Sequence, residues 1–183
     1  DRGGGESDLI GVDAEISLPG EVTVRAEAAS SDGDQSGEAF DGSAYFLEIS
    51  REEGRLEGKA YIREQDAGFG VGQQNGSESG MRKSGAEALY HFTETWSLVG
   101  EFYTQENLAT KEEREVQELG VSREKGLLEY SASFRQATDS QPGEADEKST
   151  QVTGEASWES RDGVWKLGAV HEQSVADNAN AAY

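Results

Sequence analysis

The alternation of apolar and polar residues with a period of two is the feature that most constrains how this chain can fold. Within residues 21–28 the apolar members are Val22, Val24, Ala26 and Ala28, and the polar members are Glu21, Thr23, Arg25 and Glu27. Successive side chains of a β-strand point to opposite faces of the sheet. The segment is therefore predicted to be a strand with one apolar and one polar face.

The same pattern recurs along the chain, in pairs of runs separated by short turns. The alternating runs cover residues 14–18, 45–49, 56–62, 86–92, 96–102, 119–121, 128–134, 152–158 and 165–169, and the turns lie at 19–20, 52–54, 93–94, 124–126 and 161–163. Longer polar connections are expected at 30–42, 67–80, 107–113 and 138–147. Residues 108–119 are the one helix candidate, and a short helix or a turn is considered there. We predict an all-β domain over residues 1–183, an antiparallel up-and-down meander of about ten strands that forms a barrel or part of one.

Composition excludes several classes of function. The chain carries 37 acidic and 16 basic residues, for a net charge of −21. This charge disfavours binding to nucleic acid or to the surface of an anionic membrane, both of which require clustered Lys and Arg. The lack of cysteine excludes a disulfide scaffold, thiol catalysis and a cysteine zinc site. The polar, Gly-rich start of the chain is not a signal peptide, so a mature form or an excised piece is expected.

Strands of about ten residues, joined alternately by tight turns and long loops, resemble the outer-membrane β-barrels of bacteria. The segments that carry the resemblance are residues 85–88 (GAEA), 90–101 (YHFTETWSLVGE), 69–75 (FGVGQQN), 77–80 (SESG) and 177–180 (DNAN). The resemblance implies a lipid-embedded barrel with a polar lumen that serves as a passive pore, an anchor or a scaffold for surface display. Such barrels usually finish on an amphipathic strand that ends in an aromatic residue. Tyr183 follows Asn180-Ala181-Ala182 instead, so part of a larger barrel is expected.

The same alternation also fits a water-soluble β-sandwich or barrel with its apolar face inward. Two observations favour the membrane barrel. Several apolar faces carry no charge, and a Lys or Arg facing the middle of a bilayer would cost about 2–4 kcal/mol. Many of the apolar positions are Ala or Gly, which would underfill a close-packed core. The low hydrophobic fraction of 34% favours the water-soluble domain. The alternative is therefore a secreted module that binds a ligand, a glycan or another copy of itself.

On the membrane interpretation the polar face lines either a cation-favouring pore or a plugged lumen. On the alternative it is an ordinary solvated face. The predicted lumen residues are Glu21, Arg25, Glu27, Glu57, Lys59, Arg63, Glu87, Glu101, Glu129, Arg135 and Glu155. The partners expected are the lipid bilayer of the outer membrane and, at open strand edges, other copies or the rest of a larger barrel. Localisation is expected at the outer membrane or cell surface, with secretion as the alternative.

Other candidate sites are weaker. Asp32, Asp34 and Ser36 are spaced like the first ligands of a calcium loop, but position 12 is Ser43 instead of a bidentate Glu. A flexible acidic loop is the simpler interpretation. His91 and His171 lie in predicted strands without a partner signature for catalysis or metal binding. No catalytic residues, no enzymatic activity and no cofactor other than calcium are predicted.

Aromatic residues gather near the predicted strand ends, at Trp96, Trp158, Trp165, Tyr90 and Tyr130. This placement is typical of the aromatic girdle of a membrane barrel. A sugar-binding platform in a secreted domain and an ordinary apolar core are the alternatives.

Overall fold

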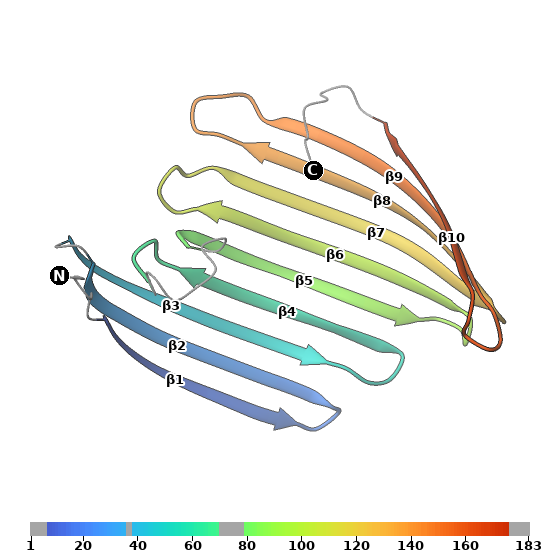
Figure 1. Ribbon diagram of the computed structural model, residues 1–183, viewed down its shortest axis with the longest axis horizontal. Helices are drawn as coiled ribbons and strands as arrows, with labels where there is room; N and C mark the ends of the chain where they lie inside the picture. Colours follow the sequence, from blue (N-terminus) through green and yellow to red (C-terminus); the bar gives the residue numbers. More distant parts are fainter. Residues whose placement is uncertain (1–6, 36–37, 70–78, 176–183) are drawn as a thin grey trace.

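A computed structural model of the 183-residue chain describes residues 7–35, 38–69 and 79–175 (Figure 1). These residues form ten strands: β1 (Ser7–Leu18), β2 (Val22–Gln35), β3 (Glu38–Arg51), β4 (Leu56–Gln65), β5 (Met81–His91), β6 (Trp96–Asn107), β7 (Glu113–Lys125), β8 (Leu128–Ser140), β9 (Glu147–Glu159) and β10 (Lys166–Ser174). No helix within the described ranges is long and apolar enough to cross a membrane.

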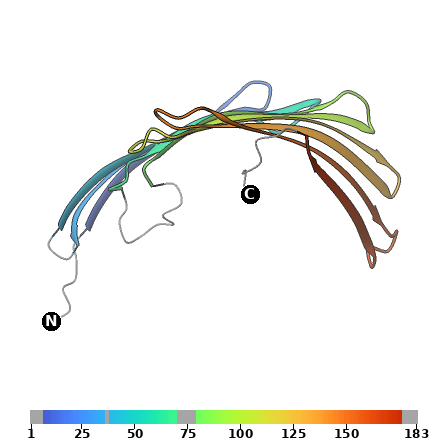
Figure 2. The same ribbon diagram turned by 90° about the horizontal axis from the view of Figure 1, so that it is seen from above.

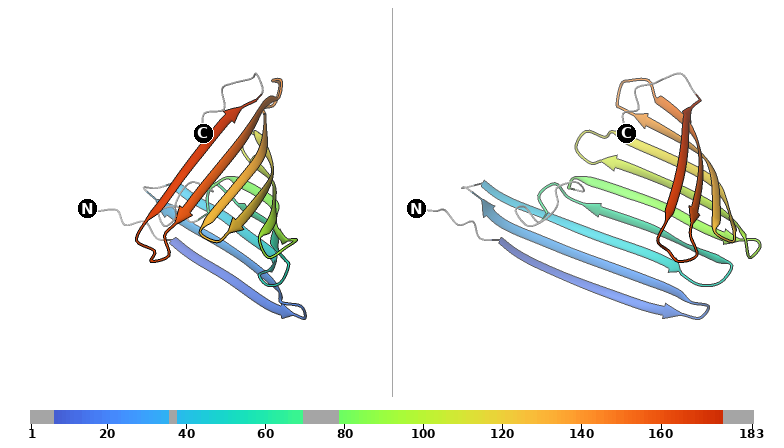
Figure 3. Two further views of the ribbon diagram at one scale, coloured as in Figure 1. Left: turned by 90° about the vertical axis from the view of Figure 1, so that its right-hand side faces the viewer. Right: turned by 45° about the vertical axis from the view of Figure 1, so that its right-hand side comes forward.

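All ten strands belong to one sheet in which the order in space is the order in the chain. Each pair of neighbours is antiparallel, so the topology is an up-and-down meander, and the predicted all-β class is confirmed. The sheet is bent into an arc, with β1 and β10 at its two ends (Figures 2 and 3). The arc is open, because β1 and β10 are not paired with each other.

Tight turns join the strands at one end of the sheet, at the positions that the sequence predicts. In the first of them Gly20 and Glu21 adopt positive φ angles of 84° and 62°. Left-handed backbone of this kind suits the tight connection of a hairpin, and Gly adopts it without strain. The chain therefore reverses within three residues, between Leu18 and Val22.

Of the two alternatives for residues 108–119, the turn is observed at 108–110 and the helix is not, because the residues from Glu113 onward form β7 and pair with β6 and β8. The long loop expected at 30–42 is wrong, because most of this segment is strand and the ladder between β2 and β3 continues to the pair Gln35↔Glu38. Polar residues extend this hairpin well past the apolar part of its strands.

Within the described residues, all strands belong to one sheet, without a second layer to pack against. Among the described residues, only Phe69, Val116 and Ala137 are buried hydrophobic side chains. A water-soluble domain of this size normally buries a contiguous apolar core between two layers. Neither face of the sheet is therefore covered by a second layer of described strands or helices.

Candidate functional site

The register of the strands sorts the side chains onto two faces, which we call the apolar face and the polar face. Val22, Val24, Ala26 and Ala28 share one face with the residues paired to them on β1 and β3. Arg25 and Glu27 share the other face, and Arg25 pairs across the sheet with Glu15 and Glu48. The period-two assignment made from the sequence is thus confirmed by the register.

The polar face is the enclosed side of the sheet. A pocket of about 810 Å³ lies over β1–β6 and is lined by polar-face side chains that include Glu27, Arg63, Lys83 and Gln105. Val116 and Ala137, which form a register pair on this face, are 0% and 2% exposed. Large side chains on the opposite face are much more open, such as Ile49 at 49% and Leu119 at 57%.

The apolar face presents a continuous band of hydrophobic side chains across all ten strands. Its large exposed members are Ile10, Val12, Ile16, Leu18, Tyr45, Leu47, Ile49, Leu56, Tyr90, Leu98, Phe102, Leu119, Leu128, Tyr130, Phe134, Val152 and Leu167. Monomeric water-soluble proteins rarely leave so large a contiguous apolar surface uncovered. A surface of this kind is normally covered by lipid or by a partner protein.

The border of this band crosses the strands obliquely. On β4 the last apolar residue toward the long connections is Ile62, which lies level with Thr104 of β6 through the register with β5. On β6 the border residue is Phe102, two residues nearer the tight turns, and it lies level with Gln136 of β8. On β8 the border residue is Phe134, again two residues nearer the turns. The border therefore shifts by about one residue for each strand.

This shift measures how the strands are inclined to the band. A residue rises about 3.4 Å along an antiparallel strand, and neighbouring strands lie about 4.8 Å apart. One residue per strand thus corresponds to an inclination of about 35°. Strands in membrane barrels are tilted by about 35–45° to the barrel axis. A belt perpendicular to the axis of such a barrel would cross its tilted strands along the same oblique line as this band.

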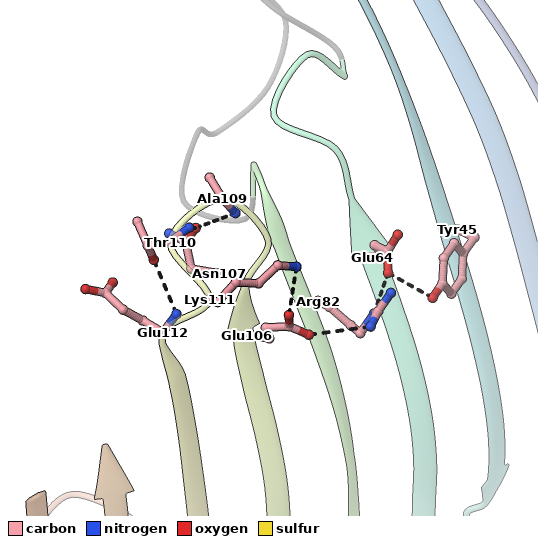
Figure 4. A network of polar contacts seen from close by, with 9 residues as sticks. All are labelled: Tyr45, Glu64, Arg82, Glu106, Asn107, Ala109, Thr110, Lys111 and Glu112. Atoms are coloured by element: carbon pink, nitrogen blue, oxygen red, sulfur yellow. Dashed lines mark hydrogen bonds and ion pairs between the residues drawn. The ribbon is translucent and has the colours of Figure 1, made fainter. Parts of the chain in front are cut away.

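A polar network marks the border of the band near the long connections (Figure 4). The hydroxyl of Tyr45 donates a hydrogen bond of 3.1 Å to Glu64, and Arg82 contacts both Glu64 and Glu106. The Nζ of Lys111 lies 3.1 Å from Glu106. On the side of the long connections, charges appear on this face only beyond the last apolar rows, so the network divides the strands into an apolar part and a polar extension.

Aromatic side chains mark the opposite border, near the tight turns. The rings of Phe92 and Trp96 stack with centroids 6.2 Å apart, and the guanidinium of Arg123 lies 5.0 Å from the Trp96 ring centroid. Tyr130 is paired with Arg123 in the register. An amphipathic ring beside a cation suits a boundary between an apolar and a wet region. The predicted gathering of aromatic residues at strand ends is therefore observed, and its girdle role stays a prediction.

The polar face carries a row of charges across its centre. Lys59, Glu87, Glu101, Glu118 and Arg135 follow one another on β4 to β8, each directly paired with the next. Lys59 lies 2.9 Å from Glu87, and Arg135 lies 4.0 Å from Glu118. Three adjacent carboxylates thus stand between two cations, so the row keeps one net negative charge and Glu101 lies between two other carboxylates.

Most of the lumen residues predicted from the sequence share the polar face. Each of them lies in a strand, and the register places its side chain on this face: Arg25, Glu27, Glu57, Lys59, Arg63, Glu87, Glu101, Glu129, Arg135 and Glu155. Glu21 lies instead in the turn before β2, where its φ of 62° interrupts the alternation. Its prediction as a strand residue is wrong.

One group on the polar face was missed from the sequence. The Nδ1 of His91 lies 2.8 Å from the hydroxyl of Ser97, and its Nε2 lies 3.5 Å from a carboxylate oxygen of Glu57. The three residues come from β5, β6 and β4. Only the register across these strands reveals the group, because Glu57 is far from His91 in sequence. The arrangement holds the imidazole in place between an acceptor and a hydroxyl.

A polar clamp fixes the connection that follows β4. The backbone N–H and the hydroxyl of Ser43 donate to Asp66 at 2.9 and 2.6 Å, and the N–H of Asp66 donates to the Ser43 carbonyl at 2.9 Å. The hydroxyl and the backbone N–H of Ser43 hold the pKa of the Asp66 carboxyl below its ordinary value. Beside the clamp, a Cβ on Gly68 would lie 2.1 Å from the Asp41 carbonyl oxygen, so the two backbones touch.

The residues proposed for calcium are not arranged as a loop. Asp32 and Asp34 lie within β2, opposite Asp41 and Ala39 of β3, and Ser36 falls outside the described residues. Within residues 7–35, 38–69 and 79–175, no cluster of three or more His, Asp or Glu side chains is placed to hold a metal ion. Calcium binding stays a prediction from spacing.

Comparison with known proteins adds no relative. No protein-family model matches this chain, and no curated protein matches it.

Proposed function

We propose that this chain is all or part of a bacterial outer-membrane β-barrel, with the apolar face toward lipid and the polar face toward a water-filled lumen. Within this class it serves as a passive pore, an anchor or a scaffold for surface display. The observation that carries the proposal is the oblique apolar band, whose inclination of about 35° matches the tilt of strands in membrane barrels.

The borders of the band support this orientation. Tyr45 on one side and Trp96 on the other place an amphipathic ring where the hydrocarbon of a bilayer would give way to polar headgroups. Beyond Tyr45 the apolar face carries the Glu64, Arg82 and Glu106 network, which fits strands that extend above a membrane. The tight turns would then lie on the periplasmic side and the long connections outside.

The polar face supports passage of cations over anions. Glu87, Glu101 and Glu118 stand side by side on three strands of the enclosed face. Carboxylates concentrated along a low-dielectric wall raise the local concentration of cations. A cation-favouring pore is therefore the specific form of the proposal.

The decisive experiment is purification and refolding with and without detergent. The proposal expects a folded, β-rich, monodisperse protein only in detergent or lipid, together with quenching of Trp96, Trp158 and Trp165 fluorescence by lipids brominated on their acyl chains. A monodisperse, β-rich protein in plain buffer would overturn it and favour the secreted binding module. A protein folded in detergent whose tryptophans are untouched by brominated lipid would also contradict it.

A further inference from the structure

We propose that the free edge of β10 pairs with the free edge of β1 of a second copy of this chain, head to tail, so that the sheet continues from one molecule into the next. The inference goes beyond the proposed function, because an open strand edge needs a partner both in lipid and in water.

Within the part of the chain that the structure describes, both terminal strands have one unpaired edge. Among the described strands, β1 is paired only with β2, and β10 only with β9. Every residue of β1 and of β10 is exposed. Each edge therefore offers a row of backbone N–H and C=O groups, which in proteins are almost always hydrogen-bonded when water is excluded.

The two edges are too far apart in the arc to satisfy each other. They lie at opposite ends of the bent sheet (Figure 2), so pairing within one chain would require the ten strands to curl further until the ends meet. A second copy can pair without changing the bend of either molecule. A head-to-tail contact of this type is heterologous and generates a ring where the rotation closes.

The directions and faces of the two edges are complementary. Strand β1 runs toward its tight turn and ends at Leu18, whereas β10 begins next to its tight turn at Lys166. Laid side by side with their turn ends level, the strands are antiparallel, as every other pair in the sheet is. The apolar residues Ile16 of β1 and Leu167 of β10 then face the same side, so the apolar band is unbroken.

The existing junctions between hairpins predict the register. Leu128, the first residue of β8, pairs with Trp158, one residue before the end of β9. Trp96, the first residue of β6, pairs with Arg123, two residues before the end of β7. Val22, the first residue of β2, pairs with Arg51, the last residue of β3. Applied to the new junction, these offsets place Lys166 opposite Leu18, Ser17 or Ile16 of the second copy.

Face parity selects one of the three registers. Lys166 lies on the polar face, as Ser17 does, whereas Leu18 and Ile16 lie on the apolar face. Lys166 therefore pairs with Ser17, and three residues further along Ala169 pairs with Ala14. Both alanines are on the apolar face, and residues directly opposite in an antiparallel pair have Cα atoms about 4.5–5.5 Å apart. This separation allows a disulfide between cysteines placed there.

The test uses disulfide crosslinking, with no background because the chain has no cysteine. Two single variants, Ala14→Cys and Ala169→Cys, are labelled with tags of different length, refolded together in detergent and oxidised. The expected result is a mixed dimer in at least about tenfold higher yield than from the control pair Glu15→Cys and Ala169→Cys, whose thiols point to opposite faces. The double variant Ala14→Cys/Ala169→Cys is expected to give a ladder of linked chains.

Three results would overturn the inference. They are a monomeric mass in detergent with no crosslink, a double variant that forms only an internal disulfide, and equal crosslinking of the matched and control pairs. Repeating the reaction in plain buffer separates this inference from the proposed function. Specific crosslinking of a protein that folds without detergent would retain the edge pairing and contradict the membrane role.

Discussion

The hydroxyl of Tyr45 donates a hydrogen bond of 3.1 Å to Glu64, while the ring of Tyr45 remains 39% exposed at the border of the apolar band. The residue thus has an apolar body on one side of the border and a polar group on the other. Glu64 is in turn held by Arg82. This hydrogen bond joins the border of the apolar band to the polar network on the extended part of the strands.

Replacing Tyr45 with Phe is expected to lower the free energy of unfolding by about 0.5–1.5 kcal/mol, the usual net contribution of one hydrogen bond. Urea unfolding of the detergent-folded protein, followed by tryptophan fluorescence, would measure the change. Tyr45→Ala should cost more, because it also removes the ring. An unchanged stability of Tyr45→Phe would show that the hydrogen bond contributes nothing, and equal losses for the two variants would show that the ring contributes nothing.

A charge placed on the apolar face should be far less tolerated than one on the polar face. We expect Leu47→Arg to lower the free energy of folding into lipid vesicles by about 2–4 kcal/mol, since the guanidinium would face the hydrocarbon. The matched control is Glu48→Arg, one residue further along β3 and on the opposite face. Similar folding yields for both variants would argue that the band does not contact lipid.

Glu101 lies between Glu87 and Glu118 in the central row of the polar face. We expect Glu101→Gln to reduce the ratio of cation to anion permeability by about twofold, because one of several partly screened carboxylates is lost. Reversal potentials across a planar bilayer with a salt gradient would measure the ratio. Glu115→Gln, on the opposite face of β7, is the control and should leave the ratio unchanged. A change in the control alone would reverse the assignment of the faces.

Gly85 permits the close packing of Tyr61 and Tyr103 on the polar face. A Cβ at Gly85 would lie 2.7 Å from the Cβ of Tyr103, whereas a Cβ at Gly100 would have no atom within 4 Å. Gly85→Ala is therefore expected to destabilise the protein by about 1–3 kcal/mol through overpacking. Gly100→Ala should be neutral or slightly stabilising. Thermal unfolding of the two variants in the same detergent would test the difference, and a neutral Gly85→Ala would contradict the close contact.

The clamp between Asp66 and Ser43 should loosen in acid. The pKa of Asp66 is lowered by hydrogen bonds from Ser43, so the folded protein favours the ionised carboxylate. Its contribution to stability is full above the ordinary Asp pKa of 3.8 and is lost as the pH falls through the lowered value. The protection of the Ser43 amide, which is its hydrogen-exchange rate relative to the intrinsic rate at the same pH, should fall below about pH 4. Asp66→Asn should remove this pH dependence, and an unchanged profile in that variant would contradict the role of the carboxylate.

The strands could be predicted where one face is apolar and the other polar. Val22 to Ala28 and Leu128 to Phe134 alternate cleanly, and the register places their apolar members on one face. The ladder between Ser31 and Gln35 could not be recognised in this way, because Ser, Asp and Gly occupy both faces there. The period-two signal vanishes when both sides of a strand are polar.

The residues of the polar face could be predicted for the same reason, since the parity within a strand fixes the face. Contacts between strands could not. The group of Glu57, His91 and Ser97 depends on the register between β4 and β5, which are joined by a connection whose length does not determine their alignment. Tight turns fix the register of a hairpin, whereas long connections leave it to the pairing of the strands themselves.

Among the described strands, each touches only the strands that precede and follow it in the chain. The stability of such a sheet is close to a sum of contributions from individual strands and from contacts between nearest neighbours, as in repeat proteins. A whole hairpin could be duplicated or deleted while the remaining contacts persist. The sheet can therefore become wider or narrower in evolution when a short gene segment that encodes one hairpin is duplicated or deleted, and the packing of the other strands need not change.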